Sequence, residues 1–146
     1  MALRRKSKDA KIELLRGVPL FSACSKRELS RIASLADEIE VPKGRVLTRE
    51  GDRGSECFVV VDGRATVTLG DRARVARLGP GACFGEMSLL DQRPRSATVE
   101  AQTDMLLLVL DSRSFSSLID EVPSVARKVL VAMAGRLRDA EGELTH

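Results

Sequence analysis

The chain has 146 residues, of which 43% are hydrophobic and 31% are charged, and its formal net charge is +3. These values are typical of one soluble globular domain and argue against a disordered chain. Apolar runs such as Met105–Leu110 are far shorter than the roughly 20 residues that span a bilayer. No signal-peptide core follows the basic start, so we expect a cytoplasmic protein without a membrane span.

Few residues in the sequence could support catalysis. The only histidine is His146, and the three cysteines, Cys24, Cys57 and Cys83, are widely separated. Nucleophilic triads, Cys–His dyads and His-based metal sites each need several such residues. We therefore expect no catalytic residue, no metal site, no cofactor and no disulfide framework.

The N-terminal part predicts a basic tail followed by helices. Residues 1–10 are interpreted as a disordered or frayed tail, with contact to nucleic acid or an anionic membrane as the alternative. A single domain over residues 11–146 then begins with helices over 11–36. Its first helix should stop at Gly17 and Pro19. Ser25 and Glu28 form a capping-box pattern ahead of an amphipathic helix over 25–36.

Residues 37–110 predict an antiparallel β-barrel. Eight of the eleven glycines lie between Gly44 and Gly85, spaced like turns between short strands. Asp62-Gly63 is a typical tight-hairpin sequence. Such spacing favours a barrel or jelly roll of about eight strands within an α+β fold. The strand-sized segments are residues 38–41, 46–49, 56–61, 65–69, 74–78, 97–101 and 105–110.

Helices return over residues 111–144. Asp111 can cap the first of them, and Pro123 should open the last. Gly135 is expected to interrupt that last helix. Its apolar stripe is interpreted first as a packing face, with a ligand lid or a homodimer seam as alternatives. The stripe consists of Val125, Val129, Met133 and Leu137.

Residues 81–99 are too long for a plain hairpin and combine groups that suit an anionic ligand. Residues 84–90 resemble one helical turn inserted between strands, whose free amides could bind an anion. Gly85 lets a ligand approach the backbone. Arg95 offers a planar, permanently charged guanidinium that suits a phosphate group.

The segments FGEMSL (84–89) and PRSAT (94–98) resemble the phosphate-binding cassette of the cyclic nucleotide-binding domain family. That family includes regulatory subunits of cyclic AMP-dependent kinase, bacterial catabolite activators and cyclic nucleotide-gated channels. Upstream, PKG (42–44), GD (51–52), FVV (58–60) and Gly63 match the family's first strands and turns in order. The resemblance covers about residues 14–140.

The resemblance implies a role for each residue of the cassette. Arg95 would pair with the cyclic phosphate, and Glu86 would accept a hydrogen bond from the ribose 2′-hydroxyl. Ser96 would reach a phosphate oxygen or a guanine amino group, which leaves the base open, although cyclic AMP is favoured over cyclic GMP. Phe84 belongs to the matched cassette and is counted with the ligand-binding residues, although its side chain is expected in the core. Backbone donors would come from Gly85, Met87, Ser88 and Ala97, and the base would lie against Val67, Leu78 and Cys83.

The resemblance also implies a sensor that moves its last helix, where Arg136 and Arg138 could cap the base. The output would pass to an effector protein, an attached domain or a second copy. The alternative is a truncated or partner-dependent regulator of the catabolite-activator type. Because the sequence leaves no room for a recognition helix, direct DNA binding is disfavoured. A phosphodiesterase is disfavoured because clustered metal ligands are missing, and a scaffold without ligand is disfavoured by Glu86 and Arg95.

Overall fold

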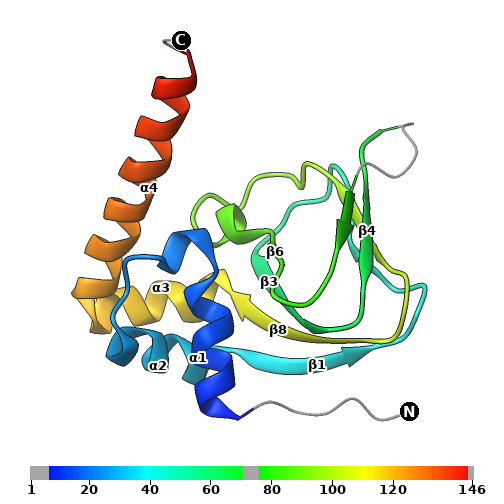
Figure 1. The fold of residues 1–146 in the computed structure, drawn as a ribbon, viewed down its shortest axis with the longest axis horizontal. Helices are drawn as coiled ribbons and strands as arrows, with labels where there is room; N and C mark the ends of the chain where they lie inside the picture. The colour runs from blue at the N-terminus through cyan, green and yellow to red at the C-terminus, as the bar shows by residue number, and fades with distance from the viewer. Residues whose placement is uncertain (1–6, 71–75, 145–146) are drawn as a thin grey trace.

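The computed structural model describes residues 7–70 and 76–144, in which helices flank a β core (Figure 1). The α+β class and the eight antiparallel strands confirm the prediction. The helices are α1 (Lys8–Arg16), α2 (Lys26–Leu35), α3 (Ser112–Glu121) and α4 (Pro123–Leu144), with short 3-10 turns η1 (Pro19–Phe21) and η2 (Glu86–Leu89). The strands are β1 (Asp37–Val41), β2 (Val46–Thr48), β3 (Glu56–Asp62), β4 (Ala65–Thr68), β5 (Ala76–Leu78), β6 (Cys83–Phe84), β7 (Thr98–Ala101) and β8 (Met105–Asp111).

Two four-stranded sheets form the β core, in the orders β1-β8-β3-β6 and β2-β7-β4-β5. Side chains alternate between the two faces of a strand, so β3 contributes to two apolar clusters. Cys57 and Val59 join the cluster that packs on the helices, whereas Phe58 and Val60 join the cluster between the sheets. The first sheet is therefore buried on both faces, and the second sheet closes the barrel.

The N-terminal helices form where their capping residues predict. The Ser25 Oγ accepts from the Glu28 amide at 3.1 Å, and the Glu28 carboxylate accepts from the Ser25 amide at 2.8 Å. This arrangement confirms the capping box. The first helix begins at Lys8 rather than at residue 11, because the Ser7 Oγ accepts from the Ala10 amide and caps it. Residues 1–6 of the expected tail lie outside the described residues.

Helix α4 is anchored at its start and leaves the domain along its length (Figure 1). Val125 and Val129 are buried against the helical cluster. Leu137 was predicted to lie on the packing face with these residues, but it is 63% exposed. The expected interruption at Gly135 is wrong, since α4 runs through it. Glycine keeps both backbone hydrogen-bonding groups, so it lowers helix stability by only about 1 kcal/mol.

Among the described residues, no helix combines the length and the apolar character that crossing a bilayer requires.

Candidate functional site

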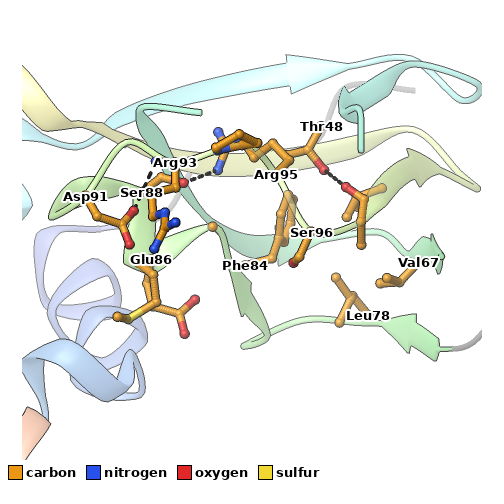
Figure 2. A pocket seen from close by; sticks show the side chains of 15 residues that line it. Thr48, Val67, Leu78, Phe84, Glu86, Ser88, Asp91, Arg93, Arg95 and Ser96 are labelled. Carbon is orange, nitrogen blue, oxygen red and sulfur yellow. Dashed lines mark hydrogen bonds between the residues drawn. The ribbon is translucent and has the colours of Figure 1, made fainter. Parts of the chain in front are cut away.

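A cavity of about 450 Å³ opens between the second sheet and the segment that links β6 to β7 (Figure 2). All the charged lining side chains come from that segment, whereas the strands contribute Thr48 and the apolar side chains of Val67, Leu78, Phe84 and Val99. In Figure 2, Val67 and Leu78 lie at the end of the cavity away from Glu86. The cavity is lined by Thr48, Val67, Leu78, Phe84, Gly85, Glu86, Met87, Ser88, Asp91, Arg93, Pro94, Arg95, Ser96, Ala97 and Val99.

All but one of the residues predicted for the ligand site line this cavity; the exception is Cys83. Cys83 and Phe84 are successive residues of β6, so their side chains point to opposite faces. Phe84 points between the sheets and stacks on Phe58, with 4.9 Å between the ring centroids. Cys83 packs against the helical cluster instead. Burial, followed by the nearby charge of Glu86, raises the pKa of its thiol to about 11.

Arg95 is held in place by both its backbone and its side chain. Its amide donates to the Asp52 carbonyl at 2.7 Å, and its carbonyl accepts from the Gly51 amide at 2.9 Å. Its Nη1 donates to the Ser88 Oγ at 3.1 Å (Figure 2). Its Cζ lies 5.9 Å from the Phe58 ring centroid, a favourable cation–π arrangement. The cavity therefore contains a fixed guanidinium.

The guanidinium of Arg95 is only partly shielded from water. Burial lowers its pKa, while the nearby Glu56 and Cys57 act in the opposite direction. Because arginine is not deprotonated in proteins, the side chain stays charged despite this shift. Among the described residues, no carboxylate forms an ion pair with Arg95. An anion that enters the cavity meets a positioned positive charge.

Gly85 precedes η2 and has a backbone conformation that other residues rarely adopt. Its φ is +77°, in the left-handed region that favours glycine. A Cβ at this position would lie 2.8 Å from the Glu56 carbonyl and 2.5 Å from the Arg95 Nη1. Gly85 therefore allows both the turn into η2 and the close approach of Arg95.

Glu86, the first residue of η2, connects the cavity to α4. Its Oε1 lies 3.7 Å from the Nη1 of Arg136, and the two side chains are 17% and 49% exposed. The interaction is therefore screened by solvent and contributes at most about 1 kcal/mol. Arg136, for which the sequence suggested a role as a cap over the base, contacts the carboxylate of Glu86 in this structure. Arg138 is exposed and is not among the lining residues.

The sequence patterns missed five of the lining residues. The Thr48 Oγ1 donates to the Ala97 carbonyl at 3.1 Å and so supports the loop that carries Arg95. The Asp91 carboxylate accepts from the Arg93 amide at 3.1 Å. Asp91 and Arg93 were within the cassette segment, and their charges were a usable signal. Pro94 and Val99 also lay within the segment over residues 81–99 but were not assigned to the ligand. The position of Thr48 depends on the pairing of β2 with β7, which the sequence does not reveal.

The cavity therefore combines the fixed cation of Arg95, the carboxylate of Glu86 in η2, which can accept a hydrogen bond, several hydroxyl groups and an apolar end. A ligand that fits these groups has an anionic group, at least one hydroxyl group and a planar apolar part. Arrangements of this kind, with a few polar groups on an apolar wall, are typical of small-molecule sites.

Comparison with known proteins identifies the family. The family model described as "cyclic nucleotide-binding domain" matches residues 38–122. The chain is 37% identical to the "Cyclic AMP receptor protein" of Thermus thermophilus, over 89% of this chain and 62% of that protein. It is 36% identical to a "Putative potassium channel protein" of Rhodopseudomonas palustris, over 82% of this chain and 29% of the relative. The chain thus spans less than two thirds of the length of these relatives.

Solved structures agree with this assignment. The N-terminal domain of a transcriptional regulator from Streptomyces coelicolor has a TM-score of 0.81 and 33% identity, covering 87% of this chain and 94% of that domain. A cyclic nucleotide-binding domain from Methylobacillus flagellatus has a TM-score of 0.75 and 26% identity, covering 93% and 79% of the two chains. The chain belongs to the cyclic nucleotide-binding domain family.

Proposed function

We propose that this chain binds a cyclic purine nucleotide, cyclic AMP in preference to cyclic GMP, in the barrel cavity and does no chemistry on it. The observation that carries the proposal is the fixed guanidinium of Arg95, which faces the same cavity as the carboxylate of Glu86. A cyclic phosphate has a single negative charge, which Arg95 can neutralise by charge-assisted hydrogen bonds. Glu86 can accept a hydrogen bond from a ribose hydroxyl.

The remaining lining residues support this orientation of the nucleotide. The amides of Gly85 and Ala97 and the hydroxyl of Ser96 are the further donors that we assign to ribose and phosphate. The base would then lie at the apolar end of the cavity against Val67 and Leu78. Burying the planar face of a purine on these side chains gives affinity without selecting strongly between adenine and guanine.

The preference for cyclic AMP rests on the relatives and on the lining. The Thermus relative is named a cyclic AMP receptor protein, and a Schizosaccharomyces pombe relative, 31% identical, is a cyclic AMP-dependent kinase regulatory subunit. Ser96 is the lining hydroxyl that could reach a guanine amino group, and it also suits a phosphate oxygen. We assign it to the phosphate, which leaves guanine without a dedicated partner.

Binding would be communicated through α4. The ion pair of Arg136 with Glu86 joins the proposed ribose site to this helix. A nucleotide that binds Glu86 would therefore alter the contact that holds α4 at this point. A ligand can shift such an equilibrium only by its differential affinity for the two states, typically 1–3 kcal/mol. The recipient would be an effector protein or an attached domain.

A second copy of the chain is the partner that α4 itself favours. Leu130 and Leu137 are 69% and 63% exposed. With Ala140 and with Met133, which also packs partly against the helical cluster, they recur at intervals of three, four and three residues, the spacing of a coiled-coil seam. We propose parallel pairing of α4 between two copies. A regulator of the catabolite-activator type would be compatible with such pairing, and the chain is similar to the solved structure of the Thermus thermophilus catabolite activator protein.

Calorimetric titration with cyclic AMP, cyclic GMP and 5′-AMP tests the proposed function. We expect saturable binding of one nucleotide per chain, tighter for cyclic AMP than for cyclic GMP and weakest for 5′-AMP. Chromatography of the mixture after prolonged incubation should return the cyclic nucleotide unchanged. Absence of binding by both cyclic nucleotides, or conversion to 5′-AMP, would refute the proposal.

A further inference from the structure

The backbone of Gly54 packs directly against the side chain of Arg95. A Cβ atom added at Gly54 would be closer than 3.0 Å to the Nε, Cζ and Cδ atoms of Arg95. Real Cβ atoms essentially never make such contacts. Gly54 does not have a positive φ, so its backbone would accept an alanine without strain. The neighbouring arginine, rather than the backbone, is what makes a side chain unacceptable at this position.

The segment around Gly54 cannot easily move away from Arg95. Arg53 forms an isolated β-bridge with Pro94, and the Gly54 amide donates to the Arg93 carbonyl at 3.4 Å. The Arg95 amide is bonded to the Asp52 carbonyl at 2.7 Å. These contacts fix the distance between the two backbones, so an added methyl group must displace the guanidinium.

The other sides of the guanidinium are also occupied. Gly85 lies near the Nη1, where its own Cβ would be 2.5 Å away. Ser88 bonds the same nitrogen, and Phe58 lies within cation–π range. Gly54 thus forms one wall of a close-fitting slot. The slot fits a guanidinium only because this wall has no side chain.

We propose that Gly54 is a positioning residue, which sets where the guanidinium of Arg95 meets the anionic group of the ligand. This inference rests on the proposed function, because it assumes that Arg95 binds the phosphate. Displacing a charged donor by about 1 Å from its productive position is enough to weaken an interaction substantially. Gly54 thereby contributes to affinity without any contact of its own with the nucleotide.

The test is a double-mutant cycle of Gly54→Ala with Arg95→Ala, read by calorimetry with cyclic AMP. Gly54→Ala should weaken binding by roughly tenfold to a hundredfold. In the Arg95→Ala background the same change should have no further effect, because the clashing side chain is gone. Gly79→Ala is the matched control, since nothing lies within 4 Å of a Cβ there, and it should bind like the parent.

Thermal unfolding of the parent, the two single variants Gly54→Ala and Arg95→Ala, and the double variant gives a second readout. Gly54→Ala should lower the melting temperature when Arg95 is present and leave it unchanged when Arg95 is absent. A Gly54→Ala variant that binds like the parent would overturn the inference. An equal loss from Gly54→Ala in both backgrounds would also overturn it, because the change would then act on the backbone. If Arg95→Ala itself binds like the parent, the proposed function fails instead.

Discussion

Replacing Arg95 by alanine removes a cation that side-chain and backbone hydrogen bonds hold against the cavity. The guanidinium would offer charge-assisted hydrogen bonds to the cyclic phosphate, each contributing about 1.5–3 kcal/mol. It is only partly buried, so water can replace part of what is lost. We therefore expect the variant to lose about 3 kcal/mol of binding free energy, less than two full-strength charge-assisted hydrogen bonds would contribute. This loss corresponds to roughly a hundredfold weaker binding.

Two further variants sharpen this measurement. Arg95→Lys keeps the charge but loses the planar fork and the contact with Phe58, so it should recover only part of the affinity. Arg93→Ala removes an exposed arginine from the same cavity lining and should change affinity by less than about fivefold. Calorimetric titration with cyclic AMP measures all three. Parent-like binding by Arg95→Ala would refute the assignment of the phosphate site.

Three more predictions concern Glu86 in the cavity, Glu28 in α2 and the exposed leucines of α4. Glu86→Gln should weaken cyclic AMP binding by roughly tenfold but leave binding of 2′-deoxy cyclic AMP unchanged, and an equal effect on both ligands in titrations would contradict the role of the carboxylate. Burial alone would raise the pKa of Glu28, but hydrogen bonds from Ser124 and Ser25 and the charge of Lys128 outweigh it and lower the pKa below its ordinary 4.5. Its stabilising contribution is therefore present above pH 4.5 and is lost as the pH falls through the lower folded-state pKa. In urea unfolding, Glu28→Gln should be less stable than the parent at pH 6, and the gap should close in acid, whereas a constant gap would argue against this linkage. Replacing Leu130 and Leu137 by glutamate should convert a dimer to a monomer in sedimentation, and a parent protein that is monomeric at high concentration would exclude the paired helix.

Local patterns predicted the elements whose signals lie within a few residues. The capping box of Ser25 and Glu28 depends on residues three apart, so it could be read directly from the sequence. The two-residue strand β6 was not predicted, since it is too short for any period and exists only because it pairs with β3. Cys83 was misplaced for the same reason. Without the pairing, the alternation that directs Phe84 into the cavity and Cys83 away from it is invisible.

The cassette could be recognised from its sequence motif, but the contacts of its residues with the rest of the chain could be seen only in the folded structure. Arg95 and Glu86 both line one cavity, as their motif had implied. The contact of Glu86 with Arg136 joins residues far apart in the chain, and no periodicity indicates it. The contact of Gly54 with Arg95 is likewise a tertiary contact, which only the folded chain reveals. A glycine in a turn gives no sign in sequence that a distant arginine lies over it.

A crystal structure of the chain with cyclic AMP tests the central claim most directly. We predict that the nucleotide occupies the barrel cavity, with its phosphate oxygens within hydrogen-bonding distance of the Arg95 guanidinium and a ribose hydroxyl on Glu86. A nucleotide bound elsewhere on the molecule, or one in the cavity whose phosphate points away from Arg95, would contradict the account.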